Sequence, residues 1–89
     1  MVSGTAIITN EAGLHLKPAA RFCEEALKFD STITFTFGNM TANAKSVLSV
    51  LSACVKKGDE IEIVCNGSDE QEALDSLCRV IREGLGNEE

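Results

Sequence analysis

Two short segments of this chain alternate between apolar and polar side chains, and they limit the possible folds more than any other feature. They are Thr32–Phe37, with the sequence TITFTF, and Glu60–Asn66, with the sequence EIEIVCN. Because successive side chains of a strand point to opposite faces of a sheet, each segment predicts a strand with one buried face. A chain of 89 residues can bury only one modest core. We therefore expect a single domain, residues 1–89, in which helices cover the buried face of a sheet.

Turn signals and helical spacing place the other elements. A tight hairpin turn at Gly38-Asn39 is expected to join Thr32–Phe37 to a shorter strand. From residue 16 to about residue 28, apolar side chains recur three and four residues apart, which is typical of an amphipathic helix. The order β-α-β-β-α-β-α predicts an α+β fold, in which a four-stranded antiparallel sheet carries three helices on one face. The expected strands are 2–9, 32–37, 40–43 and 60–66, and the expected helices are 16–28, 46–54 and one that 67–69 opens and that ends near 84.

The acidic balance of the chain excludes two classes of partner. Its 14 Asp and Glu against 8 Lys and Arg give a formal net charge of −6, and no Tyr or Trp is available for stacking on bases. Such a surface repels nucleic acid and anionic lipid, so we expect no nucleic-acid partner. No apolar run approaches the ~20 residues that cross a bilayer, and the N-terminus lacks the features of a signal peptide. We expect a cytoplasmic protein without membrane insertion.

Four cysteines stand far apart and form no C-x-x-C pair. Metal sites and redox motifs usually need such a pair, and disulfide scaffolds are usually denser. Cys23, Cys65 and Cys78 each share the spacing of neighbouring apolar residues, so we expect them to pack in the core. We expect all four thiols, Cys54 included, to be reduced packing residues, and we expect neither a metal site nor a cofactor.

His15 is the only histidine, and it stands directly before a helix whose first turn contains Pro18. Near the N-cap of that helix, the free N–H groups of Leu16 and Lys17 would lie close to the imidazole ring. A helix N-terminus favours bound anions, and Lys17 and Arg21 add positive charge. An imidazole is substantially neutral at pH 7 and can act as a nucleophile, which suits a covalent phosphohistidine. The alternative is an ordinary surface histidine at a helix start, and this segment alone leaves both readings open.

The helix expected after Ser46 is too apolar for an ordinary surface element. Ser46 is well placed as its N-cap, accepting a hydrogen bond from a backbone N–H two or three residues on. We expect Val50 to pack on the sheet, which leaves Val47, Leu48 and Leu51 at least partly exposed. Contiguous exposed apolar residues usually mark a protein-binding surface, although a neighbouring loop could instead cover them.

Five short motifs, in order along nearly the whole chain, carry a family resemblance. They are GLHLKPAA at 13–20, NAKS at 43–46, KKGDEI at 56–61, DEQEAL at 69–74 and GLG at 84–86. Together they resemble the HPr family, the histidine-containing phosphocarrier proteins of the phosphoenolpyruvate-dependent sugar phosphotransferase system of bacteria. This resemblance is more specific than any one motif, because the five motifs occur without large insertions between them.

The resemblance implies an open-faced β-sandwich and a carrier within a phosphotransferase relay rather than a self-sufficient enzyme. It implies that His15 takes a phosphoryl group at Nδ1 from enzyme I and gives it to sugar-specific IIA proteins or domains. The backbone N–H groups of Leu16 and Lys17 would bind the phosphate, and the Lys17 side chain would contact phosphate or partner. Ser46 would be a regulatory serine, with HPr kinase/phosphatase and a catabolite-control regulator as further partners. The partner surface of this expected monomer would comprise Leu16, Ala20, Arg21, Lys45, Val47, Leu48, Leu51 and Ser52.

Two residues depart from the family pattern. A small residue and then arginine usually follow the histidine, whereas Leu16 and Lys17 stand here. Lysine keeps the charge but loses the planar, bidentate donor geometry of guanidinium, and Leu16 adds bulk beside the ring. Phosphoryl transfer could therefore be slower or directed to a specialised partner. These two residues also keep open an alternative function, a regulatory relative that acts mainly through phospho-Ser46 in carbon catabolite control.

Overall fold

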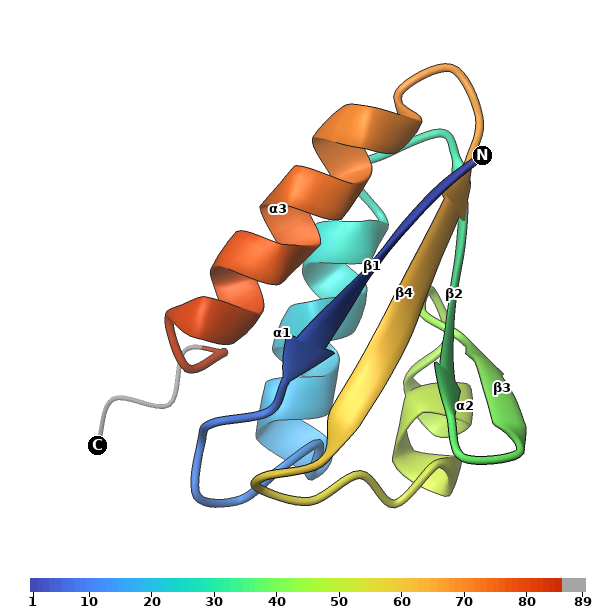
Figure 1. The fold of residues 1–89 in the computed structure, drawn as a ribbon. Coiled ribbons are helices and arrows are strands. Elements are labelled where there is room, and N and C mark those ends of the chain that lie inside the picture. Colours follow the sequence, from blue (N-terminus) through green and yellow to red (C-terminus); the bar gives the residue numbers. More distant parts are fainter. Residues whose placement is uncertain (86–89) are drawn as a thin grey trace.

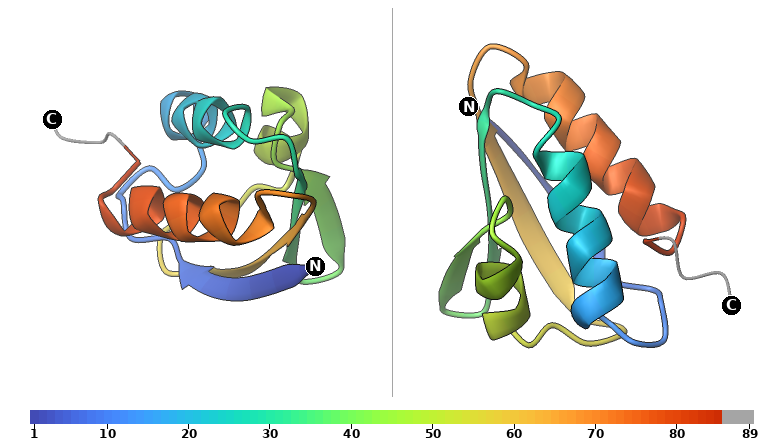
Figure 2. Two further views of the ribbon diagram at one scale, coloured as in Figure 1. Left: turned by 90° about the horizontal axis from the view of Figure 1, so that it is seen from above. Right: turned by 180° about the vertical axis from the view of Figure 1, so that it is seen from behind.

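Four antiparallel strands form one sheet, and three helices lie on one of its faces (Figures 1 and 2). The structure is a computed structural model and describes residues 1–85. The predicted order of elements and the α+β fold class are confirmed. Gly86, the last residue of the GLG motif, and the end of the predicted 1–89 domain lie outside the described residues. The elements are β1 (Val2–Ile7), α1 (Leu16–Ala26), β2 (Thr32–Phe37), β3 (Met40–Asn43), α2 (Val47–Ser52), β4 (Glu60–Asn66) and α3 (Glu70–Arg82).

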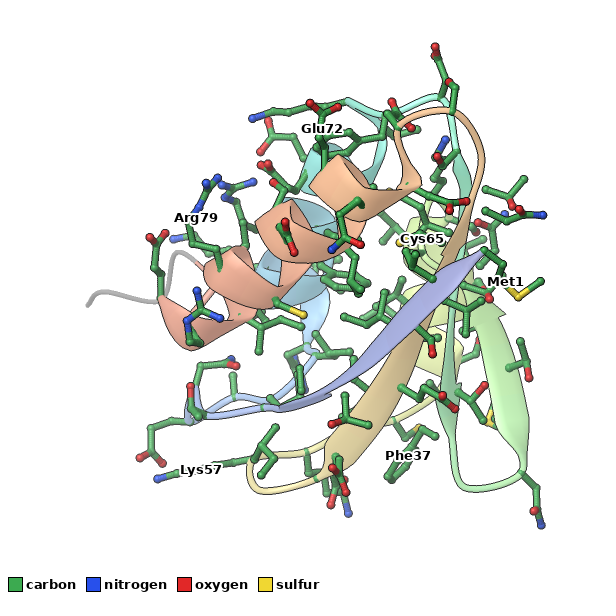
Figure 3. The ribbon with its side chains drawn as sticks, turned by 45° about the horizontal axis from the view of Figure 1, so that its top comes forward. Met1, Phe37, Lys57, Cys65, Glu72 and Arg79 are labelled. Atoms are coloured by element: carbon green, nitrogen blue, oxygen red, sulfur yellow. The ribbon has the colours of Figure 1, made fainter. Side chains whose placement is uncertain are left out.

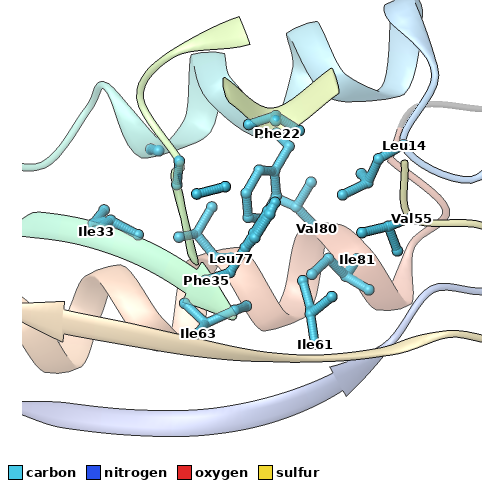
Figure 4. Packing of buried hydrophobic residues seen from close by; sticks show 14 of the residues in the cluster. Leu14, Phe22, Ile33, Phe35, Val55, Ile61, Ile63, Leu77, Val80 and Ile81 are labelled. Carbon is cyan, nitrogen blue, oxygen red and sulfur yellow. The ribbon is translucent and has the colours of Figure 1, made fainter. Parts of the chain in front are cut away.

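The two alternating segments form the centre of the sheet, whose strand order is β1-β4-β2-β3. In β2 and β4 the residues Ile33, Phe35, Ile61 and Ile63 are buried, whereas the intervening Glu62 is exposed. Phe35 pairs with Ile63 across the two strands, so the buried faces coincide. This register confirms the one-sided burial that the alternation predicts, and it directs all four apolar side chains toward the helices (Figure 4).

Helices α1 and α3 supply the other half of the core. Phe22 of α1 meets Phe35 of β2 with ring centroids 5.7 Å apart, a tilted aromatic contact (Figure 4). On α3 the buried residues Leu77, Val80 and Ile81 face the sheet, whereas Glu72 and Arg79 point outward (Figure 3). None of the helices in residues 1–85 is long and apolar enough to span a bilayer.

Several predicted boundaries shift by one to three residues, for local reasons. β1 ends at Ile7 because Ile8 bonds with the turn before β4, accepting from Gly58 N at 2.7 Å. α1 ends at Ala26 rather than near 28, since Lys28 N donates to the carbonyl of Glu25, three residues back, in a tightened last turn. α2 is shorter than predicted because Ser46 is its N-cap and Ala53 its C-cap, and neither cap residue belongs to the helix itself.

The four thiols do not all pack as predicted. Cys23 and Cys65 are buried and Cys78 is half-buried, whereas Cys54 is exposed, and all four are free. Burial raises the pKa of Cys65 to about 11, which keeps that thiol protonated at neutral pH. The packing role predicted for Cys54 is wrong. Cys54 follows the C-cap of α2 with a φ of 56°, a left-handed conformation that ends the helix and turns the side chain outward.

A buried carboxylate joins α1 to α3. Glu25 retains only 4% of its side-chain exposure, and its carboxylate accepts from Arg21 at 2.9 Å and lies 3.0 Å from Lys28 Nζ. It also accepts a hydrogen bond from the Ser76 hydroxyl of α3. Burial alone would raise the pKa of Glu25, but the hydrogen bonds from Ser76, Arg21 and Lys28 outweigh it and lower the pKa to about 2. The ionised carboxylate is therefore stabilised in the folded state.

We expect the substitution Glu25→Gln to lower the free energy of unfolding at pH 7 by about 3 kcal/mol, the equivalent of the pKa shift from 4.5 to about 2. Because the folded pKa of Glu25 lies below its unfolded value, this stabilisation is complete above about pH 4.5 and is lost as the pH falls toward about 2. Urea unfolding of the wild type and the variant between pH 7 and pH 2.5 measures it. The exposed neighbour provides the control, and Glu24→Gln should change the stability by less than about 0.5 kcal/mol. Parallel pH curves for wild type and Glu25→Gln would contradict the prediction.

Candidate functional site

His15 is exposed and is the N-cap residue of α1. Its backbone is extended, with φ −80° and ψ −174°, and its carbonyl accepts from Ala19 N at 2.7 Å. Among the described residues, the imidazole makes no capping hydrogen bond to the helix. The first-turn N–H groups of Leu16 and Lys17 have no carbonyl partner within the helix, and Pro18 has no N–H. The helix therefore begins beside an exposed imidazole with two backbone donors available.

A close contact between two loops holds the segment that presents His15. Gly13 is buried with a φ of +67°, and a Cβ atom there would lie 2.6 Å from the carbonyl oxygen of Val55 and 2.7 Å from Cα of Lys56. Leu14 N donates to Val55 O at 2.9 Å, and its side chain is buried in the core. Only glycine combines this conformation with this approach. The backbone immediately before His15 is thus fixed to the loop that follows α2.

A shallow hollow of about 260 Å³ opens beside His15, between the start of α1 and the end of α2. Most of its lining comes from the two loops that meet at Gly13, so the hollow belongs to the same local structure as the imidazole. A group attached to the ring of His15 would stand at the edge of this hollow. The lining residues are Ala12, Leu14, His15, Leu51, Cys54, Val55 and Lys56.

Helix α2 packs beside α1 (Figure 2). It exposes apolar side chains next to the hollow. Leu48 is 77% exposed and Leu16 is 63% exposed, whereas Val50 is fully buried. Val47 and Leu51 are half-buried, so the predicted partial exposure of α2 is confirmed. We call Leu16, Val47, Leu48 and Leu51 the apolar patch. Nothing in residues 1–85 covers Leu16 or Leu48, which leaves both side chains available to another protein.

The three cationic side chains expected at the site differ in whether they already have an ion-pair or hydrogen-bond partner. Arg21 is committed to Glu25, at 2.9 Å, and the ammonium of Lys45 donates to the carbonyl of Phe29 at 2.6 Å. Lys17 is exposed, and no carboxylate in the described part of the chain lies within ion-pair distance of it. Of these three side chains, Lys17 is the one that an incoming anion meets without competition.

Ser46 is the N-cap of α2, as its sequence position predicts. Its hydroxyl oxygen accepts from the backbone N–H of Ser49 at 3.2 Å, and the residue is half-buried. The exposed Leu48 lies within the first turn of the same helix, so the hydroxyl of Ser46 adjoins the apolar patch. Ala20 and Ser52 are exposed, and the Ser52 hydroxyl donates to the carbonyl of Leu48 at 2.8 Å.

The structure adds Cys54 and Lys56 to the residues that surround His15. Sequence reasoning missed both, because the hydrogen bond from Leu14 to Val55 brings distant segments together and has no pattern in the sequence. Within residues 1–85, no group of three or more His, Cys, Asp or Glu side chains could hold a metal ion.

Comparisons with known proteins agree on one family. The family model described as "PTS HPr component phosphorylation site" matches residues 2–83. The phosphocarrier protein HPr of Mycoplasma capricolum is 38% identical over 77 residues, which cover 86% of each chain. A crystal structure of HPr-C-His from Thermoanaerobacter tengcongensis superposes with a TM-score of 0.95 at 37% identity and covers 100% of both chains. Crh, the catabolite repression containing protein of Bacillus subtilis, was solved as a swapped dimer. It gives a TM-score of 0.76 at 34% identity, covering 94% of this chain and 97% of the other.

We expect Cys54→Gly to raise the free energy of unfolding by roughly 0.5–1 kcal/mol, because glycine adopts a left-handed backbone without steric cost. Chemical denaturation of the two proteins under reducing conditions measures the change. Cys54→Ser serves as the control, since it removes the thiol but keeps a Cβ at the φ of 56°. An equal gain from serine would mean that the thiol, and not the backbone, is responsible.

Proposed function

The chain belongs to the HPr family of phosphocarrier proteins, and from this premise we propose that it carries a phosphoryl group on His15 between two protein partners. The observation that supports the proposal most directly is the exposed imidazole at the start of α1, beside the N–H groups of Leu16 and Lys17. These donors and the positive end of the helix suit a group with two negative charges. The adjoining apolar patch offers a surface on which a partner can dock.

The transfer step needs little from the chain itself. The lone pair of Nδ1 on the neutral imidazole attacks phosphorus, while Nε2 keeps its proton. A bond forms between Nδ1 and phosphorus as the bond between phosphorus and the donor breaks, and the donor keeps that electron pair. The same step in reverse passes the group to the acceptor. This chain contributes an accessible nucleophile, the donors of Leu16 and Lys17 and the Lys17 charge, and each partner excludes water from the site.

The proposed partners are enzyme I as the donor and sugar-specific IIA proteins or domains as acceptors. The apolar patch, with Ala20, Arg21, Lys45 and Ser52 around it, is the proposed docking surface for both. A carrier that meets two partners in turn has to leave the same face free each time, which supports a monomer. We also propose a cytoplasmic location for this chain, which its membership of the family supports.

A second candidate function is regulation through phospho-Ser46 in carbon catabolite control, with HPr kinase/phosphatase and a catabolite-control regulator as partners. The similarity to Crh favours it, as does the position of Ser46 beside the apolar patch. The exposed His15 favours the carrier function, because regulation through Ser46 alone would not require an accessible imidazole. The two functions are compatible in one chain, in which phosphorylation of Ser46 would control the rate of phosphoryl transfer to and from His15.

We expect enzyme I and phosphoenolpyruvate to add one phosphoryl group to the wild-type chain and none to His15→Ala. Intact mass spectrometry at neutral pH measures the adduct, and a repeat after brief acid treatment should remove it, because the phosphorus–nitrogen bond of phosphohistidine is labile in acid. A wild-type reaction without enzyme I is the control. An acid-stable adduct, or an adduct on His15→Ala, would contradict the proposed function.

We expect phosphorylation of Ser46 to slow the phosphorylation of His15 without unfolding the domain. The modification adds about −1.5 to −2 charges at pH 7 next to the apolar patch, and burying that charge against a partner would weaken docking. The dependence of the His15 reaction on enzyme I concentration should therefore shift to higher concentrations, while the melting temperature stays within a few degrees.

Two variants separate charge from capping in this experiment. Ser46→Ala loses the bond to Ser49 and should cost about 1 kcal/mol of stability without slowing His15 phosphorylation. Ser46→Asp keeps an acceptor and adds one charge, so it should slow the reaction less than phosphoserine does. Unchanged kinetics in the phosphoserine form would rule out the docking explanation.

A further inference from the structure

We infer that Lys56 is a second phosphate-contacting cation at this site, and that its ammonium group and that of Lys17 contact the phosphoryl group on His15 from two sides. The inference rests on the proposed function, because it concerns the phosphorylated form of His15. Lys56 lines the same hollow as the imidazole, although it comes from the loop after α2 and not from α1.

The backbone of Lys56 is fixed beside the segment that carries His15. A Cβ atom on Gly13 would lie only 2.7 Å from Cα of Lys56, so the two backbones are in direct contact. Lys56 N donates to Asp59 Oδ2 at 2.9 Å, and Lys56 O accepts from Asp59 N at 3.0 Å. These two bonds order the turn itself, and the bond from Leu14 N to Val55 O joins that turn to the segment that carries His15.

The side chain of Lys56 remains available, in contrast to its neighbour. Lys57 Nζ lies 2.6 Å from a carboxylate oxygen of Glu11. No carboxylate in residues 1–85 lies within ion-pair distance of Lys56 or of Lys17. Arg82 also lacks such a partner among these residues, but it lines a separate hollow between β1 and α3. The two lysines near His15 are therefore free to meet an anion.

Two lysines can supply what one lysine lacks. An ammonium group is a compact point charge, whereas a planar guanidinium contacts two oxygens of one phosphate at once. With Lys17 on α1 and Lys56 on the opposite loop, two oxygens of the phosphoryl group each meet a cation. The pair thus compensates for the lysine that follows Leu16 in this chain, and the attraction strengthens when a docked partner excludes water.

The test loads His15 without enzyme I. Phosphoramidate transfers its phosphoryl group to an imidazole nitrogen, and ammonia is the leaving group. ³¹P NMR then follows, as a function of pH, the protonation of the bound phosphoryl group from dianion to monoanion. A nearby cation favours the dianion, so Lys56→Gln should move the midpoint up by about 0.8 pH unit, the effect of a unit charge about 4 Å away in water. Lys56→Arg should restore the wild-type midpoint.

Lys57→Gln is the matched control, since it removes an adjacent, also exposed lysine that is paired with Glu11. It should leave the midpoint unchanged. Equal midpoints in the wild type and Lys56→Gln, or equal shifts from both substitutions, would overturn the inference. A slower reaction of Lys56→Gln with enzyme I but an unchanged ³¹P midpoint would also overturn it and would assign Lys56 to partner docking. A wild-type chain that accepts phosphate from phosphoramidate but not from enzyme I would contradict the proposed function alone.

Discussion

The contact between Gly13 and the segment of Val55 and Lys56 is the constraint on which the site depends. A side chain at Gly13 would need the space that Val55 O and Lys56 Cα occupy, so any other residue would push the two loops apart. The same contact sets the start of α1, because His15 follows two residues later and caps the helix. The position of the imidazole, the shape of the hollow and the place of Lys56 are consequences of one backbone approach.

The sheet and the helices make that approach possible at low cost. Leu14 and Val55 are both buried in the core, so the two loops are anchored by apolar side chains as well as by the bond from Leu14 N to Val55 O. Glu25 joins the C-terminal end of α1 to α3 through Ser76, which steadies the helix that presents His15. The functional end of α1 can therefore leave its imidazole and its first N–H groups exposed, because the rest of the helix is held elsewhere.

Local patterns in the sequence predicted the parts of this structure that repeat with a fixed period. The alternation in Thr32–Phe37 and Glu60–Asn66 predicted two strands to the residue, and the cap at Ser46 followed from residue type. Contacts between distant segments have no such period. The partners of Glu25 and the exposure of Cys54 depend on how α1, α2 and α3 meet, and so they became visible only in the folded chain.

The charge distribution explains how an acidic chain can still accept a phosphoryl group. The formal net charge is −6, and the transferred group adds further negative charge next to His15. Charges more than about 8 Å away are largely screened at physiological ionic strength, so the distant acidic residues contribute little at the imidazole. The nearby groups matter most, and the positive ones within residues 1–85 are Lys17 and Lys56, neither of which has a carboxylate at ion-pair distance there, together with the donors at the start of α1. Glu11 lies in the loop that leads to His15, and its carboxylate is 2.6 Å from Lys57 Nζ. An acidic surface and an anion-accepting site therefore coexist because the lysines near the imidazole have no carboxylate within ion-pair distance in the described part of the chain.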